Sequence, residues 1–216
     1  MKRFLSLIAP AALVLLVACG GGSDPAAPAP SPAASLAYTD PVATSHDWKL
    51  VKDASSTGSF LVLNLVGPSD GSTYRGVGFT LKLDPTKLKA GKFKDATGNP
   101  LGYYKDGGIF LDKNNAHNDM PPSLQAGGYL NGNLMVGIYQ KTDEALWGTD
   151  RGAIAKNCSG TVLQVALELD PSLKAMPGEV PLTITKAKLI QGLLADAMWD
   201  RRMVPVTIKV GTLTLK

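Results

Sequence analysis

Two stretches, GVGFTLKLDPTKLKAG (residues 76–91) and VLQVALELDPSLKAMPG (residues 162–178), carry the clearest indication of the fold. Each runs in apolar alternation into Leu-Asp-Pro, and each continues with a Leu-Lys pair and a glycine. Alternation over several residues is typical of a strand with one buried face. Asp commonly turns the chain, and proline stops the pairing of a strand. We therefore expect Asp84 and Asp170 to end two strands as parts of the scaffold, rather than to form a pair of catalytic carboxylates.

Period-two patterns recur along most of the chain, and Asn131-Gly132 between apolar flanks is the strongest hairpin signal. Short alternating segments separated by Gly and Pro are typical of sandwiches. The sequence therefore predicts an all-β, antiparallel jelly-roll sandwich of about nine strands. Only LIQGLLADAMW (residues 189–199) has helix-like spacing, and it predicts one short helix. The strand patterns are FLVLNLV (60–66), VGFTLKL (77–83), GGYLNGNLMVGIYQ (127–140), TVLQVALEL (161–169), EVPLTITKAKL (179–189), VPVTIKV (204–210) and TLTL (212–215).

The first residues have the composition of an export signal. A basic start, MKR, precedes the apolar run FLSLIAPAALVLLVA, which is too short and wrongly flanked for a membrane-spanning helix. Because LVAC (residues 16–19) follows, the segment resembles a bacterial lipoprotein signal. The resemblance implies cleavage before Cys19, acylation of Cys19 and attachment to the lipid bilayer. Gly20, where Asp would signal inner-membrane retention, implies an outer-membrane lipoprotein that faces the periplasm or the cell surface.

The remaining chain divides by composition into a linker and one domain. Residues 1–18 form the predicted signal peptide, and residues 19–35 form a Gly/Ala/Pro/Ser tether that begins at the lipidated cysteine. Residues 36–216 are long enough for a single domain with a substantial core. The chain has 22 Lys and Arg against 18 Asp and Glu, and Lys2 and Arg3 leave with the signal peptide. With charges this balanced and no basic run interleaved with aromatics, we exclude nucleic-acid binding.

Catalytic patterns are weak. GPSDG (residues 67–71) matches G-x-S-x-G, but a nucleophile elbow requires a helix after the serine, and here a predicted strand follows. We therefore expect Ser69 to lie in a turn. The two histidines, His46 and His117, have no flanking motif of a triad or a zinc site. The sequence predicts a protein that is not an enzyme.

Three groups of residues are candidates for other roles. Asp112, Asn114 and Asp119 supply oxygen ligands at spacings that calcium accepts, although a solvated loop would have the same composition. Tyr104, Tyr129 and Trp147 could stack against sugar rings or pack in the fold. If Cys19 is lipidated, Cys158 has no disulfide partner in the chain, and we expect a buried, unreactive thiol.

The order of the strand motifs resembles that of cohesin domains. LVLNLVGPSDGSTYRGVGFTLKLDPTKLK, NGNLMVGIYQK, GTVLQVALELDPSLKAMPGEVPLTITKAKL and VPVTIKVGTLTL follow one another in the cohesin order, over residues 61–215. The resemblance implies a nine-stranded jelly roll akin to certain carbohydrate-binding modules. It also implies a protein partner, since cohesins bind dockerin modules through one sheet face. No motif marks that face in this sequence.

Together these observations predict a membrane-anchored, non-enzymatic binding module of the bacterial envelope. The expected partner is a protein, either a dockerin-like module or a component of the envelope or secretion apparatus. The alternative is a polysaccharide bound by the exposed aromatics, and a hydrolase is the less favoured third reading. No cofactor other than calcium is suggested.

Overall fold

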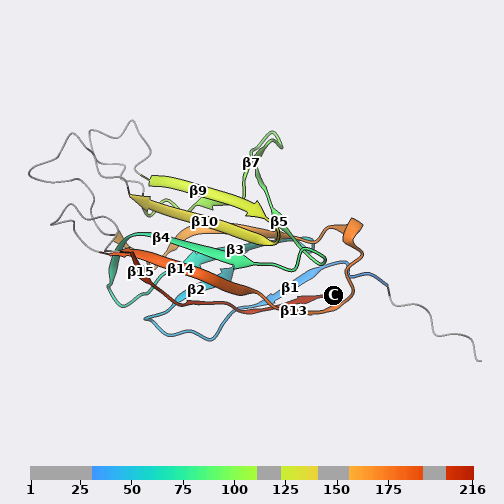
Figure 1. The fold of residues 1–216 in the computed structure, drawn as a ribbon, viewed down its shortest axis with the longest axis horizontal. Coiled ribbons are helices and arrows are strands. Elements are labelled where there is room, and N and C mark those ends of the chain that lie inside the picture. Colours follow the sequence, from blue (N-terminus) through green and yellow to red (C-terminus); the bar gives the residue numbers. More distant parts are fainter. Residues whose placement is uncertain (1–30, 111–122, 141–155, 192–202) are drawn as a thin grey trace, which may run out of the picture. The chain divides into compact units, whose positions relative to one another are not determined.

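The computed structural model describes residues 31–110, 123–140, 156–191 and 203–216 (Figure 1). The chain divides into two units, Met1–Pro30 and Ser31–Lys216, and the described residues belong to the second. In this part of the chain the structure is nearly all β, with one short 3-10 turn, η2 (Pro171–Leu173), as its helical element.

Most strands belong to two sheets, here named sheet I and sheet II. In spatial order, sheet I consists of β15 (Met203–Pro205), β14 (Thr183–Gln191), β4 (Thr73–Lys82), β10 (Asn133–Gln140) and β9 (Ser123–Leu130), with β11 (Lys156–Asn157) also paired to β4. Sheet II consists of β16 (Ile208–Lys209), β2 (Trp48–Lys52), β3 (Phe60–Val66), β12 (Thr161–Glu168) and β5 (Lys89–Gly91), with β8 (Tyr104–Asp106) also paired to β12. The remaining strands form a three-stranded sheet of β1 (Leu36–Thr39), β17 (Thr212–Leu215) and β13 (Gly178–Val180), and a hairpin of β6 (Phe93–Lys94) and β7 (Pro100–Gly102).

The pairing is antiparallel throughout the described residues, except between β16 and β2. Figure 1 shows β4, β10 and β14 side by side in front of β2 and β3. The predicted antiparallel sandwich is thus confirmed. The described residues contain seventeen strands rather than about nine, because several strand ends and connections form short pairs of two or three residues.

The core lies between the two sheets and follows from the alternation in the sequence. Val77, Phe79 and Leu81 on β4 are buried, whereas Gly78 and Thr80 between them are only partly covered. Facing side chains of sheet II complete a single apolar cluster, in which the fully buried members include Leu50, Leu61, Leu63, Leu65, Leu163, Val165 and Leu167. The hydrophobic effect, which favours the burial of this apolar surface, is the main contribution to the packing of the two sheets.

The predicted hairpin at Asn131-Gly132 is confirmed. These two residues have φ angles of 49° and 76°, which is the left-handed conformation that a two-residue hairpin loop requires. The turn places Asn133 opposite Leu130 and thereby sets the register of β9 and β10.

The predicted helix over residues 189–199 is wrong for residues 189–191, and the rest of it lies outside the described residues. Leu189 belongs to β14, where it is buried opposite Val77 of β4. Pairing with β4 extends β14 through these residues, with a register shift between Ile190 and Gln191, so tertiary contacts override a local helix-like spacing.

Residues 33–35 form hydrogen bonds with the end of the chain and with the segment after η2. The backbone N–H of Ala33 donates to the carbonyl of Ala175 at 2.6 Å, and that of Ser35 donates to the carbonyl of Lys216 at 2.9 Å. These residues, expected to be part of the tether, are therefore bonded to the sandwich.

Candidate functional site

The outer face of sheet I has an unusual surface for the middle of a sheet. The residues that point away from the core include Gly78 on β4 and Gly137 on β10, which lie directly opposite one another. One step along the strands, Met135 on β10 lies opposite Gly128 on β9. On the other side of β4, Lys188 on β14 is the partner of Gly78. Three neighbouring strands thus present glycine close together on the same face.

These glycines form part of a shallow groove of about 560 Å³. Because glycine has no side chain, the backbone of Gly78, Gly128 and Gly137 forms the floor of the groove. The side chains of Met135 and Met203, from β10 and β15, also line it. The groove therefore lies across the sheet rather than between the two sheets.

Packing against the described residues does not require the glycines of the floor. A Cβ atom added to Gly137 would lie 3.6 Å from its nearest neighbour, one added to Gly78 would lie 3.4 Å away, and one added to Gly128 would have none within 4 Å. By contrast, a Cβ on Gly76 would lie 2.3 Å from the Cβ of Tyr139, so that glycine is required by its neighbour. Glycine inside a strand weakens it, and it often marks a position where another backbone or a ligand approaches closely.

Three of the six large hydrophobic residues that are exposed in the described part of the chain also lie on this sheet. Leu130, Met135 and Met203 are 64%, 47% and 46% exposed, and all three lie on strands of sheet I. The register places Leu130 beside Asn133 at one end of the outer face, and Met203 beside Ile190 at the other. Contiguous exposed apolar surface on a sheet is a common sign of an interaction site.

The tyrosines predicted to bind sugars lie where an edge of sheet I meets an edge of sheet II. The ring of Tyr104 on β8 covers Gly127 of β9, where an added Cβ would lie 2.3 Å from it. The ring of Tyr129 contacts that of Tyr103 at a centroid distance of 6.0 Å, and the ammonium of Lys92 lies 5.2 Å from the ring centre of Tyr103. Burial raises the pKa of both Tyr104 and Tyr129. All three rings pack against the core, while Trp147 lies outside the described residues.

The two Leu-Asp-Pro corners are built in the same way. Asp84 accepts hydrogen bonds from the backbone N–H and the hydroxyl of Thr86, at 3.0 Å and 2.6 Å. Asp170 caps η2 by accepting a hydrogen bond from the N–H of Ser172 at 2.8 Å. Lys89, which follows the first corner, forms an ion pair with Asp170 of the second. These bonds favour the ionised carboxylate and lower the pKa of Asp84. The two carboxylates are scaffold residues, as the sequence indicated.

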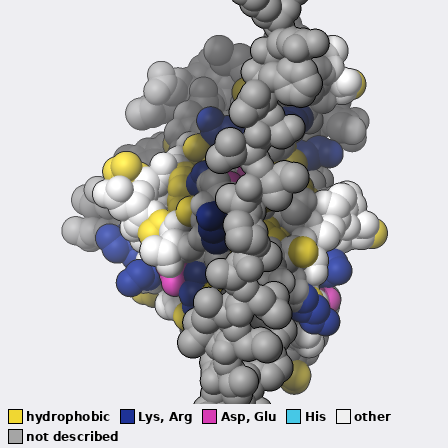
Figure 2. All heavy atoms as spheres, turned by 90° about the vertical axis from the view of Figure 1, so that its right-hand side faces the viewer, with side chains coloured by type: hydrophobic (Ala, Val, Ile, Leu, Met, Phe, Trp, Pro, Cys, Tyr) yellow, Lys and Arg dark blue, Asp and Glu magenta, His cyan; other side chains and the backbone are white. Residues whose placement is uncertain are grey.

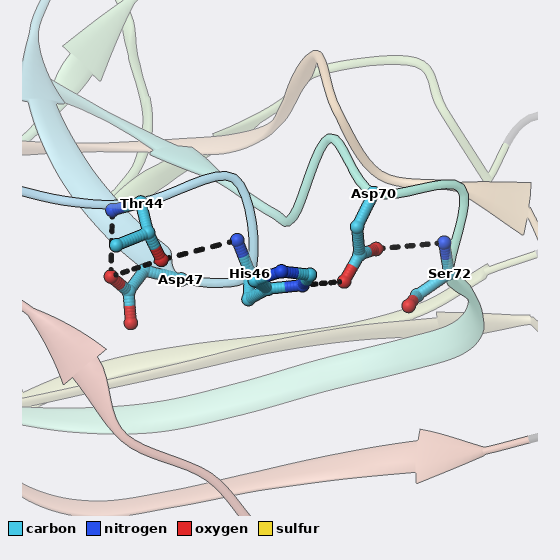
Figure 3. A network of polar contacts seen from close by, with 5 residues as sticks. All are labelled: Thr44, His46, Asp47, Asp70 and Ser72. Carbon is cyan, nitrogen blue, oxygen red and sulfur yellow. Dashed lines mark hydrogen bonds and ion pairs between the residues drawn. The ribbon is translucent and has the colours of Figure 1, made fainter.

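Ser69 lies in the exposed turn between β3 and β4, as predicted. Its N–H donates to the carbonyl of Ser45 at 2.7 Å, and the adjacent Asp70 lies 2.6 Å from Nδ1 of His46 (Figure 3). Hydrogen bonds from Ser72 and His46 lower the pKa of Asp70 to about 2. The His46 side chain is 74% exposed, so this pair joins two surface turns rather than forming a water-excluding catalytic site.

Cys158 is a buried thiol, as expected. It is fully buried beside Gly67, and its Sγ lies 3.4 Å from the carbonyl oxygen of Lys156. Burial raises the pKa of this thiol to about 12, which keeps it protonated and unreactive at neutral pH.

The remaining candidate residues fall outside the described part of the chain. This applies to the predicted calcium ligands Asp112, Asn114 and Asp119, and to the lipidation site Cys19. Among the described residues, no three His, Cys, Asp or Glu side chains are grouped so that they could hold a metal ion. The same residues include no helix with the length and hydropathy needed to cross a membrane.

Comparison with solved structures identifies cohesin modules as similar folds. A type II cohesin domain from the cellulosome of Acetivibrio cellulolyticus matches at a TM-score of 0.49 and 13% identity, over 77% of this chain and 93% of that chain. A structure of a type I cohesin–dockerin complex from Clostridium thermocellum matches at a TM-score of 0.41 and 12% identity, over 79% of this chain and 96% of that chain. A non-cellulosomal cohesin from Archaeoglobus fulgidus matches at a TM-score of 0.38 and 11% identity, over 83% of this chain and 89% of that chain. No protein-family model and no curated protein matches the sequence.

The glycine floor was not recognised from the sequence. The segments GVGF and MVGIY each place a glycine between apolar residues of a strand, and this was the available signal. Only the register of β4 and β10 shows that Gly78 and Gly137 face one another and open onto the same surface.

Proposed function

We propose that this protein is a non-enzymatic binding module that holds a protein partner on the outer face of sheet I. The observation that carries the proposal is the groove floored by Gly78, Gly128 and Gly137, together with the exposed side chains beside it. A groove whose floor is bare backbone lets a partner come closer to the sheet than ordinary side chains would permit. A dockerin-like module, or a component of the envelope or secretion apparatus, is the class of partner that the sequence resemblance suggests.

A protein fits this surface better than a small molecule does. The groove is shallow and lies on a sheet, whereas sites for small ligands are concave and bury most of the ligand. Leu130, Met135 and Met203 extend the apolar surface across the strands, as expected for the centre of a protein interface. Met suits such a surface because its flexible side chain adapts to a partner.

The proposal is tested by filling the floor of the groove. The mature chain and its Gly137→Leu variant are each immobilised and exposed to the envelope and secreted proteins of the producing cell. We expect the mature chain to retain a defined protein that Gly137→Leu does not retain. Gly58→Leu is the control, because an added Cβ there would lie 3.7 Å from its nearest neighbour, away from sheet I.

Retention of the same proteins by all three forms would contradict the proposal, since the bound surface would then lie elsewhere. Retention of a polysaccharide by all three forms, lost in a Tyr129→Ala variant, would instead favour the carbohydrate-binding alternative at the tyrosines. Melting curves of each variant verify that the chain has folded.

We also propose that Cys19 is acylated and that the domain is held at the outer membrane by the tether. The basis is the signal-like sequence before Cys19 and the Gly/Ala/Pro/Ser composition after it. Acyl chains that together bury many methylene groups anchor a protein stably. The Cys19→Ala variant is expected to accumulate as an unlipidated precursor and to leave the outer-membrane fraction. Unchanged partitioning of that variant with the outer membrane would contradict the anchor.

A further inference from the structure

Sheet I carries positive charge and no negative charge. Its strands β15, β14, β4, β10 and β9 contain no Asp or Glu. Lys82, Lys186 and Lys188 lie on these strands with exposed side chains, and the last two line the groove. The positive charge is therefore beside the apolar floor rather than at a distant edge.

This charge distribution is specific to one sheet. Sheet II carries both signs on its strands, with Glu168 on β12, Asp106 on β8 and lysines on β2, β5, β8 and β16. The whole chain is close to balance, with 22 basic and 18 acidic residues. Figure 2, which views one end of the molecule, shows basic side chains next to hydrophobic ones and few acidic ones.

Lys82, Lys186 and Lys188 of sheet I form no ion pair with another described residue. The ion pairs of His46 with Asp70 and of Lys89 with Asp170 both lie away from sheet I. Lys186 lies opposite Thr80 and Lys188 opposite Gly78, so neither has a carboxylate beside it in the sheet. An ammonium on the rim of an apolar groove favours a partner that brings the opposite charge.

A second copy of this chain would not supply that charge. In a symmetric contact through sheet I, the strands of each copy would bring no carboxylate to the lysines of the other. The charge pattern thus favours an acidic partner over a second copy as the occupant of the groove.

We infer that the partner is an acidic polypeptide segment, in which Asp or Glu side chains flank small apolar residues that enter the groove. The inference rests on the proposed function, since it describes the partner of the same surface. The apolar residues lie over Gly78 and Gly137, while the carboxylates of the partner lie beside Lys186 and Lys188. Charges at the rim act mainly on the rate and selectivity of association, so the complex is expected to weaken as salt is added.

A random peptide library displayed on phage tests this inference with the full mature chain. The library is selected on the wild type, and peptides that also bind Gly137→Leu are removed. We expect the remaining peptides to be enriched in Asp and Glu next to apolar residues. A synthetic peptide of that type should bind the Lys186→Glu/Lys188→Glu variant about tenfold more weakly than the wild type. Lys49→Glu/Lys105→Glu, on the outer face of sheet II, should leave its binding unchanged.

The outcomes separate the inference from the proposed function. Groove-dependent peptides without an acidic bias, or with a basic one, would overturn the inference and leave the groove as a binding surface. Equal loss in the sheet I and sheet II variants would also overturn it, because the effect would then come from net charge. A selection that yields no peptide dependent on Gly137 would overturn the inference and the proposed function together.

Discussion

At the level of single residues, several of the described aspartates organise turns. Asp84 and Asp170 each follow a buried leucine, accept hydrogen bonds from the residue two positions later, and precede a proline. Such a residue satisfies backbone donors that the end of a strand leaves free. Asp70 has the same role in the turn after β3, where it bonds Ser72 and also reaches His46. The ionised carboxylate is the form that makes these bonds.

We therefore expect acid to weaken the fold partly through Asp70. Its pKa is about 2 in the folded protein, below the usual value of 3.8. A lowered folded-state pKa stabilises the protein above the unfolded-state pKa, and that stabilisation is lost as the pH falls from about 4 to about 2. Denaturant unfolding at several pH values should show a smaller decline over this interval in Asp70→Asn than in the wild type. Parallel declines in the two proteins would show that Asp70 has no share in the acid sensitivity.

At the scale of the strands, the glycines of sheet I fall into two kinds. Gly76 and Gly127 lie under the tyrosine side chains of Tyr139 and Tyr104, so their lack of a side chain is used by the fold itself. At Gly78 and Gly137 an added Cβ would meet only backbone atoms among its nearest described neighbours, and both glycines line the groove. A strand gains stability from side chains that pack against neighbouring strands. Glycines such as Gly78 and Gly137 therefore lower the stability of the sheet, and no contact with the described residues compensates for this.

Matched alanine substitutions distinguish the two kinds. Gly137→Ala should raise the free energy of unfolding by about 0.5–1 kcal/mol, because alanine has less backbone entropy to lose. Gly76→Ala should lower it by about 1–3 kcal/mol, because the new Cβ would overlap the Cβ of Tyr139. Urea unfolding of both variants measures whether each substitution raises or lowers the free energy of unfolding. A destabilised Gly137→Ala would mean that this glycine serves the fold rather than the surface.

The sequence was sufficient for the architecture of these strands but not for the candidate site. A strand or a hairpin turn can be recognised from a few neighbouring residues. The alternation around Phe79 and Leu167 correctly predicted strands, and Asn131-Gly132 correctly predicted a hairpin. The groove depends on which strands are neighbours, and this pairing is set by contacts between residues distant in the chain. Local sequence was also insufficient at Leu189. The spacing of apolar residues around it indicated a helix, but the residue lies in a strand that pairs with β4.

At the scale of the whole domain, the first and last described strands pair with one another. β1 pairs with β17 from Leu36 opposite Leu215 to Thr39 opposite Thr212, so the first strand depends on the last. Tyr38 joins this sheet to sheet II, because its hydroxyl donates to the carbonyl of Leu50 at 3.0 Å and accepts from the N–H of Gly211 at 2.6 Å. Burial raises the pKa of this tyrosine to about 12. The hydroxyl of Tyr38 therefore links the sheet of the first and last strands to sheet II.

Removing the Tyr38 hydroxyl should weaken the entire domain. Tyr38→Phe retains the ring but leaves the buried carbonyl of Leu50 and the N–H of Gly211 without this partner. A lost buried hydrogen bond of this kind costs about 1–3 kcal/mol. For a domain of this size, each kcal/mol lowers Tm by about 2–4 °C. Tyr74→Phe is a comparison variant on β4, and calorimetry should show a larger loss for Tyr38→Phe. Equal losses would argue against a special role of Tyr38.

The proposed function requires that the outer face of sheet I contacts a protein. Site-specific photo-crosslinking in the producing cell tests it most directly, with a benzophenone amino acid in place of Met135 on sheet I or Lys105 on sheet II. Both positions are exposed, on opposite sides of the sandwich core. We expect illumination to yield a discrete higher-mass adduct from position 135 and none from position 105. An adduct from position 105 alone, or none from position 135, would contradict it.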